Sequence, residues 1–96
     1  MSAYVLVQVT IHDCDQYEEY KKLTPATIAK HGGRFIVRGG DTEILEGEKN
    51  FERFVLLEFD SMEQAKTWYD SAEYQNAKVI RQAASDGLVM IADGCS

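Results

Sequence analysis

The stretch that decides the fold is residues 31–40, which read HGGRFIVRGG. Gly32 is placed to take the left-handed conformation that ends a helix, and Gly33 lets the chain reverse without a Cβ clash. Alternating residues follow, and Gly39 and Gly40 then indicate a turn. The stretch predicts the end of a helix, a strand and a turn within ten residues.

The strand predicted at 34–38 has two unlike faces. Because successive side chains of a strand point to opposite sides, Phe35 and Val37 share an aliphatic face, whereas Arg34, Ile36 and Arg38 share the other. This mixed face is too apolar to leave in water and too charged for an ordinary core. What covers it is therefore the main question for function.

Three further strands are predicted at 4–11, 51–59 and 88–92, and they divide in the same way. Their aliphatic faces predict one side of a core, although Arg53 lies among the inward positions of 51–59. Their mixed faces carry Tyr4, Leu6, Gln8, Phe54, Leu56, Glu58, Leu88 and Met90.

Two helical regions separate the strands. Asp13 is placed to cap the first, and Pro25, preceded by Thr24, predicts a kink or a restart within it. Ser61 is placed to cap the second region, which Ser71 interrupts and caps again. The element order is therefore strand, helix, strand, strand, helix, strand.

This order favours an α+β fold of the ferredoxin-like βαββαβ type, with a four-stranded antiparallel sheet and the helices on one face. The helices cover the aliphatic face, so the mixed face has no cover from its own chain. A second sheet is the natural cover for such a patch. We therefore expect residues 1–96 to form a single domain that pairs as a homodimer.

Composition limits the partners. The 96 residues are 45% hydrophobic and 27% charged, as in folded soluble proteins. The formal net charge is −6 and no basic run is present, so neither nucleic acid nor an anionic membrane is an expected partner. The opening segment lacks the features of a signal peptide, and the expected location is cytoplasmic. Cys14 and Cys95 are expected at opposite ends of adjoining strands, too far apart for a disulfide.

Arg34, Arg38 and Glu58 form the most informative polar group, because alternation places all three on the mixed face. They predict a site for an anionic or polar small molecule, in which an arginine holds a carboxylate or enolate and Glu58 orients it. The alternative is an ion-pair network that seals the dimer interface. The loop length does not settle which arginine pairs with Glu58.

Other candidates each have a structural alternative. His31 and Glu58 are the candidate catalytic residues, but His31 also suits the negative end of a helix dipole. Trp68, Tyr69 and Tyr74, with aromatics of the first helix, predict either an aromatic pocket or ordinary core. Ser71 is better explained as a helix cap than as a nucleophile. No phosphate loop, dinucleotide motif, zincin motif or paired-cysteine zinc motif occurs, so no cofactor and no metal are expected.

Several motifs together resemble one known family. They are His31-Gly32-Gly33-Arg34, Arg38-Gly39-Gly40, Leu45-Glu46-Gly47, the strand Arg53-Phe54-Val55-Leu56-Leu57-Glu58-Phe59 and the segment Trp68-Tyr69-Asp70-Ser71-Ala72-Glu73-Tyr74. In this order they resemble the uncharacterised family called domain of unknown function 1330, over nearly the whole chain. Ala72 stands where many relatives are expected to have proline.

The resemblance implies membership of the dimeric α/β-barrel proteins, which agrees with the homodimer inferred from the strand faces. That wider group includes cofactor-independent monooxygenases, muconolactone-isomerase-like enzymes and haem-degrading enzymes. Two functions are thus in view: a dimer that binds a small polar or aromatic metabolite between its sheet and the partner subunit, as a cofactor-independent isomerase or monooxygenase, or a non-enzymatic dimer whose mixed face is only an interface.

Overall fold

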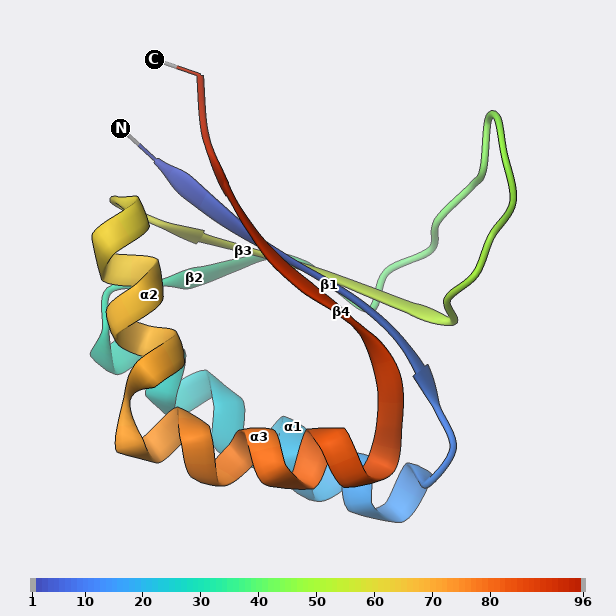
Figure 1. Cartoon of the computed structure of the whole chain (residues 1–96), viewed down its shortest axis with the longest axis horizontal. Coiled ribbons are helices and arrows are strands. Elements are labelled where there is room, and N and C mark those ends of the chain that lie inside the picture. The colour runs from blue at the N-terminus through green and yellow to red at the C-terminus, as the bar shows by residue number, and fades with distance from the viewer. Residues whose placement is uncertain (1, 96) are drawn as a thin grey trace.

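The computed structural model describes residues 2–95. The elements follow in the order β1 (Ala3–Ile11), α1 (Cys14–Lys30), β2 (Arg34–Arg38), β3 (Arg53–Phe59), α2 (Met62–Asp70), α3 (Ala72–Ala84) and β4 (Ser85–Asp93). The strands form one antiparallel sheet in the order β2-β3-β1-β4, and the helices lie together on one side of it (Figure 1). This confirms the ferredoxin-like arrangement.

The core fills the space between the sheet and the helices. Alternate residues of β1 and β3 are buried, as expected for strands with one face on a core. Aromatic rings join the layers, since Trp68 of α2 lies 5.4 Å from Phe59 of β3 and 4.2 Å from Tyr74 of α3, measured between ring centroids. The largest fully buried side chains are Trp68, Tyr74, Phe59, Leu57, Val5 and Val9.

The end of α1 has the predicted geometry. Gly32 has a φ of +77°, its N–H donates to the Ala29 carbonyl at 3.1 Å, and the Gly33 N–H donates to the Ile28 carbonyl at 2.9 Å. This pair of bonds is a Schellman motif, which satisfies carbonyls that the helix end leaves free. A Cβ on Gly33 would lie 2.4 Å from the Phe59 ring, so the chain turns here against the core.

The predicted helix caps are also confirmed. The backbone N–H of Gln16 donates to the Asp13 carboxylate at 3.1 Å, and that of Gln64 donates to the Ser61 hydroxyl at 3.1 Å. Ser71 separates α2 from α3 and accepts a hydrogen bond from the Tyr74 N–H at 3.2 Å. Ser71 is therefore a helix cap.

Of the kink or restart expected at Pro25, the restart is wrong, because α1 runs unbroken from Cys14 to Lys30. Proline has no N–H, so Pro25 cannot donate to the carbonyl of Lys21, four residues earlier. Arg38 of β2 instead donates to that carbonyl through Nη2 at 3.1 Å. The tertiary contact supplies the hydrogen bond that the helix lacks, and the helix continues.

Arg38 reaches α1 because β2 contains an irregularity that its alternating sequence does not indicate. Arg34 and Phe35 pair with Glu58 and Leu57, but Val37 pairs with Leu56 and Arg38 with Val55, so the register shifts between Phe35 and Val37. The extra residue reverses the alternation beyond it. Val37 therefore lies on the open face and Arg38 on the helix side, contrary to the expected placement of both.

Element ends also differ from expectation. β4 begins directly at Ser85, three residues before the predicted start of this strand at Leu88, and pairs with β1 along its whole length. Gly87 allows the two strands to pack closely, since a Cβ there would lie 2.0 Å from the Gln8 carbonyl oxygen. β3 begins at Arg53, two residues later than predicted, and residues 39–52 form an exposed loop.

The mixed face of the sheet has no cover from its own chain within residues 2–95, as expected. Ile36 and Leu88 are each 49% exposed and Met90 is 46% exposed. Figure 1 shows the helices on the opposite side of the sheet, while loop 39–52 projects away from the helices. We call this uncovered surface the open face; it carries Tyr4, Leu6, Gln8, Arg34, Ile36, Val37, Phe54, Leu56, Glu58, Leu88 and Met90.

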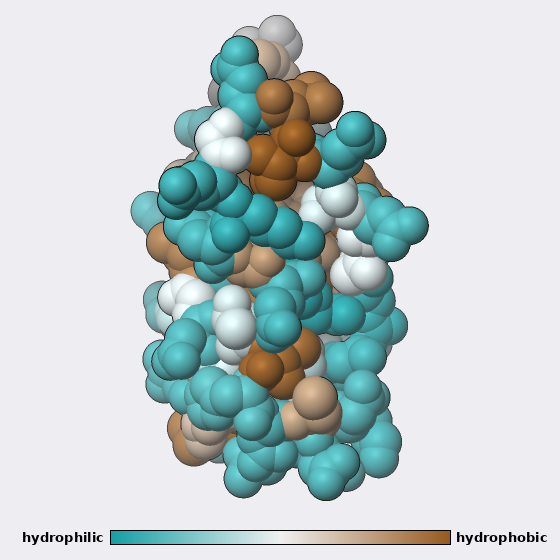
Figure 2. Space-filling model, turned by 90° about the vertical axis from the view of Figure 1, so that its right-hand side faces the viewer, coloured by the Kyte–Doolittle hydropathy of each residue, from teal (hydrophilic) through white to brown (hydrophobic). Residues whose placement is uncertain are grey.

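The surface elsewhere is largely polar. Figure 2 shows the side where loop 39–52 lies, where hydrophilic residues predominate and hydrophobic surface is confined to separate patches. Cys14 and Cys95 are both exposed free thiols, so the predicted absence of a disulfide between them is confirmed. None of the helices in residues 2–95 has the length and apolar composition needed to cross a lipid bilayer.

Candidate functional site

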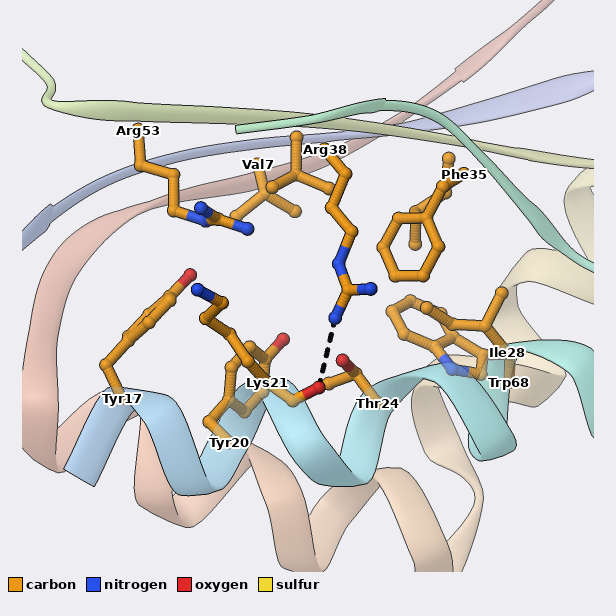
Figure 3. Close-up of a pocket in the computed structure, with 12 residues that line it drawn as sticks. Val7, Tyr17, Tyr20, Lys21, Thr24, Ile28, Phe35, Arg38, Arg53 and Trp68 are labelled. Atoms are coloured by element: carbon orange, nitrogen blue, oxygen red, sulfur yellow. Dashed lines mark hydrogen bonds between the residues drawn. The ribbon is translucent and has the colours of Figure 1, made fainter. Parts of the chain in front are cut away.

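A cavity lies between α1 and the helix side of the sheet, with Trp68 of α2 at one end (Figure 3). Its volume is about 20 Å³, which is space for about one water molecule. Its lining comes from five elements and comprises Val7, Tyr17, Tyr20, Lys21, Thr24, Ile28, Phe35, Arg38, Arg53, Val55, Leu57 and Trp68.

The cavity is cationic. Lys21 of α1, Arg38 of β2 and Arg53 of β3 all contribute to its lining, and within residues 2–95 that lining includes no Asp or Glu. The chain as a whole carries a net charge of −6, so this concentration of positive charge runs against the composition. A small anion is the ligand that such a lining favours.

Only part of this charge is compensated. Lys21 pairs with Glu18 of its own helix at 3.2 Å, a partner near the surface. Arg38 donates to the Lys21 carbonyl and stacks on Phe35, with its guanidinium carbon 4.5 Å from the ring centroid. Arg53 lies 5.8 Å from the Tyr17 ring centroid, and among the described residues its buried Nε has no hydrogen-bond partner.

Two tyrosines of α1 add hydroxyl groups to the cavity. Burial raises the pKa of Tyr17, although the charge of Arg53 opposes this shift. Burial, together with the neighbouring Tyr74, raises the pKa of Tyr20 well above its usual value. Both hydroxyls therefore stay protonated near neutral pH, and the Tyr20 hydroxyl lies 2.8 Å from that of Tyr74, with which it shares a hydrogen bond.

The rest of the cavity wall is apolar or aromatic. Trp68 is 1% exposed and is fixed by a hydrogen bond from its Nε1 to the Thr27 hydroxyl at 3.1 Å. Ile28 and Phe35 complete the wall near the Arg38 side chain (Figure 3). The cavity thus has cationic side chains on one part of its lining and aromatic or apolar side chains on the other.

Arg34 and Glu58 lie away from this cavity, on the open face. Arg34 holds the Glu58 carboxylate through Nη2 at 2.8 Å and Nε at 2.9 Å, which settles the arginine that Glu58 pairs with. The Tyr4 hydroxyl donates to the same carboxylate at 3.3 Å. Hydrogen bonding from Ser2 and the charge of Arg34 lower the pKa of Glu58. Arg34 and Glu58 therefore form an ion pair on the open face, whereas Arg38 lies on the other side of the sheet.

The remaining predicted site residues are dispersed. His31 occupies the C-cap of α1, where its Nδ1 lies 2.9 Å from the Thr27 carbonyl, and it borders a shallow groove beside α2. Tyr74 is fully buried behind the cavity. Tyr69 packs against Trp68 and Tyr74 at ring-centroid distances of 6.2 and 5.5 Å without lining the cavity. Of the predicted ligand-binding residues, only Arg38 and Trp68 line it.

One further residue of the cavity lining could have been identified from the sequence as a candidate site residue. Arg53 occupies an inward position of β3, and an arginine among inward aliphatic side chains is unusual because a buried charge needs a partner. The spacing of Tyr17 and Tyr20 indicates only that they belong to the aromatic group of the first helix. Lys21 gave no signal, because a lysine on a helix is ordinarily solvated.

Within residues 2–95, no cluster of three or more His, Cys, Asp or Glu side chains is placed to hold a metal ion. The candidate site thus consists of arginine, lysine, tyrosine and an aromatic wall. These groups can bind and orient an anion and can stabilise negative charge that develops on a ligand oxygen.

Solved structures of similar fold span almost the whole chain. A protein of unknown function from Rhodopseudomonas palustris superimposes with a TM-score of 0.81 at 17% identity, covering 99% of this chain and 83% of that one. A dimeric ferredoxin-like protein of unknown function from Jannaschia sp. CCS1 gives 0.74 at 14% identity, covering 98% and 100%. SnoaB, a cofactor-independent oxygenase from Streptomyces nogalater, gives 0.66 at 12% identity, covering 99% and 94%.

At these identities the structural likenesses establish the fold alone. No curated protein sequence matches the chain significantly. Residues 2–95, however, match the family described as Domain of unknown function (DUF1330), which confirms the resemblance found in the glycine and strand motifs. The chain therefore belongs to the family of domain of unknown function 1330.

Proposed function

We propose that this protein is a homodimeric barrel that binds a small organic anion, with an aromatic or apolar body, in the cavity between α1 and the sheet. The observation that carries the proposal is the cavity lining: Lys21, Arg38 and Arg53 face a space bordered by no acidic residue of the described chain. A carboxylate or enolate would supply the missing counter-charge.

Different lining residues would bind the charged end and the body of the ligand. Arg53, whose Nε lacks a partner among the described residues, and Arg38 would hold the negative oxygens, because a guanidinium matches a carboxylate with paired donors. The hydroxyl of Tyr20 would donate a further hydrogen bond. Trp68 and Phe35 would pack against the body of the ligand.

Entry requires Arg38 to move, since the cavity holds only about one water molecule while Arg38 is bound to α1. Arg38 is an exposed residue of an edge strand, so its side chain is free to swing outward. An anion would offer it a charged acceptor in place of the neutral Lys21 carbonyl. The ligand would thus replace the bond that closes the cavity.

The homodimer in this proposal is supported by the open face, whose apolar side chains lack cover from residues 2–95, and by the dimeric description of the Jannaschia neighbour. The ligand site now lies within one subunit rather than between the sheet and the partner, because Arg38 turns toward α1. Two exposed free thiols fit a reducing compartment, and the proposal assumes a cytoplasmic location.

The test uses the indole N–H of Trp68, the single tryptophan of the chain, as a reporter on the cavity wall. In ¹⁵N-edited spectra, benzoate is expected to shift this signal in a saturable manner, and uncharged benzamide at the same concentrations is expected to leave it nearly unchanged. Arg53→Gln is expected to weaken benzoate binding about tenfold or more, because it removes a charged donor.

Arg34→Gln is the matched control, since Arg34 precedes Phe35 on the same strand as Arg38 but faces the opposite side of the sheet. It is expected to keep the benzoate affinity of the unmodified protein. If benzoate and benzamide shift the Trp68 signal equally, or neither does, the anion site is refuted and the non-enzymatic dimer becomes the better account.

A cofactor-independent oxygenase is a second candidate, favoured by the fold shared with SnoaB and by cations that would stabilise a phenolate or enolate. An oxygen electrode would measure oxygen uptake with a panel of hydroxylated arenes, using Arg53→Gln as the inactive reference. If no compound in the panel raises oxygen uptake above the rate of the Arg53→Gln variant, the oxygenase function is refuted. Ligand binding then remains the proposed function.

A further inference from the structure

The two arginines of the cavity come from neighbouring positions of the sheet. Arg38 of β2 pairs with Val55 of β3, and Arg53 lies two residues before Val55 on the same strand, so it shares the face of Val55. Arg38 and Arg53 are therefore diagonal neighbours, with their Cα atoms about 7–8 Å apart. Both cations line the cavity, to which no Asp or Glu of residues 2–95 contributes.

Different neighbours hold the two guanidinium groups. That of Arg38 lies 4.5 Å from the Phe35 ring centroid and donates to the Lys21 carbonyl at 3.1 Å. That of Arg53 lies 5.8 Å from the Tyr17 ring centroid. Because Tyr17 and Lys21 are four residues apart on α1, these points on the helix are about 6 Å apart along its axis. Figure 3 shows Arg53 with Tyr17 toward one end of the cavity and Arg38 beside Phe35 nearer the other.

The missing side chain of Gly39 leaves room for the Arg53 guanidinium. A Cβ on Gly39 would lie 2.2 Å from Nη1 and 2.8 Å from Cζ of Arg53, so the guanidinium packs directly against the backbone of Gly39. Among the described residues, the buried Nε of Arg53 has no hydrogen-bond partner. Arg53 is therefore placed by packing rather than by an acidic partner, and its Nε still needs an acceptor.

One carboxylate cannot serve both arginines in these positions, because its two oxygens are bonded to the same carbon atom. A monoanion at Arg53 would leave Arg38 with only the neutral Lys21 carbonyl as its acceptor. Lys21 itself has a carboxylate partner, since Glu18 lies 3.2 Å from its Nζ. The charges that remain to be matched are thus those of the two arginines.

We propose that the ligand is a dianion: an aromatic or apolar body with two carboxylate or enolate groups, one bound by Arg53 inside the cavity and the other by Arg38 at the edge strand. This inference rests on the proposed function, since it names the ligand class of the same site. Arg38 is the more exposed of the two arginines, so the group that it binds lies nearer to solvent. A dianion would form a charge-assisted pair with each guanidinium, whereas a monoanion would form only one.

The test compares a dicarboxylate with its own monoamide, which has nearly the same shape and one negative charge fewer. The probes are isophthalate and terephthalate, each measured beside its monoamide, and the Trp68 indole signal reports binding. At least one of the two dicarboxylates is expected to bind about tenfold more tightly than its monoamide. In Arg38→Gln the same dicarboxylate and its monoamide are expected to bind about equally, because the second carboxylate has lost its cation.

Arg34→Gln is the matched control, since it removes the same charge from the same strand but on the open face. Its preference for the dicarboxylate is expected to equal that of the unmodified protein. The preference is a ratio of two affinities measured within one variant, so a change in stability that weakens both ligands alike does not alter it.

The outcomes separate this inference from the proposed function. If neither benzoate nor any of these compounds shifts the Trp68 signal, the proposed function fails, and this inference fails with it. If benzoate binds and neither dicarboxylate binds more tightly than its monoamide, the anion site stands and the dianion is wrong. The dianion is also wrong if the preference survives in Arg38→Gln, or if Arg34→Gln reduces it equally, because overall charge would then explain the preference.

Discussion

At the residue scale, Gly33 shows how one missing side chain joins two layers of the fold. The Schellman motif brings the chain out of α1 at Gly33, directly against the Phe59 ring and Ile28. A methyl group here would lie 2.4 Å from Phe59 and 2.9 Å from Ile28, closer than packed atoms allow. The constraint is steric, because φ of Gly33 is not positive.

Gly33→Ala is therefore expected to lower the free energy of unfolding by about 1–3 kcal/mol, the usual cost of overpacking a core. Urea unfolding followed by Trp68 fluorescence would measure it. Gly40→Ala is the matched control, since the nearest atom to its Cβ is 3.8 Å away, and the stability of that variant should stay within about 0.5 kcal/mol of the unmodified protein. Equal stability of both variants would contradict the packing argument.

At the element scale, β2 supplies a hydrogen bond that α1 cannot make within itself. Pro25 leaves the Lys21 carbonyl without its helical donor, and the irregularity in β2 turns Arg38 to the side where that carbonyl lies. The resulting hydrogen bond of 3.1 Å links the helix to the edge strand across the cavity.

Restoring the helical donor should therefore uncouple the two elements. Pro25→Ala supplies an N–H to Lys21 and is expected to raise the free energy of unfolding by about 1 kcal/mol or more. Arg38→Gln is expected to be destabilising in the unmodified protein and nearly neutral in the Pro25→Ala background, with a coupling of about 1 kcal/mol in urea unfolding. Additive effects of the two substitutions would show that Arg38 does not replace the missing helical bond.

At the scale of the whole molecule, the open face is the apolar surface that residues 2–95 of a single subunit leave uncovered. Leu56 lies at its centre, paired with Leu6 of β1 and with Val37 of β2. A surface of this kind is typical of a subunit interface, and in the proposed homodimer two such sheets face each other.

Leu56→Lys is expected to convert the dimer to monomer at micromolar concentration, because it would place two unpaired cations in the interface. Sedimentation velocity would measure the change. Val79→Lys, which introduces the same charge at a position 65% exposed on α3, is expected to remain dimeric, as is Arg38→Gln. A dimeric Leu56→Lys protein would mean that the open face is not the interface.

Local patterns in the sequence were sufficient for most of the fold. Alternation in the strands, the caps at Asp13, Ser61 and Ser71, and the glycine end of α1 depend on neighbours within a few residues. They predicted the order of the elements and the buried face of the sheet. Alternation also limited the partner of Glu58 to Arg34 or Arg38, since both arginines lie on the strand next to that of Glu58 along the chain. The structure shows that the partner is Arg34.

Only the tertiary structure decided where the candidate site lies. The side to which Arg38 points depends on the pairing of β2 with β3, a contact between chain segments that the long loop 39–52 separates. One extra residue in that pairing reverses the direction of every later side chain, and the amino-acid pattern of β2 is compatible with either register. The sequence by itself determined the faces of the sheet, whereas the register between two strands placed Arg38 on the helix side, where Lys21 and Arg53 also line the cavity.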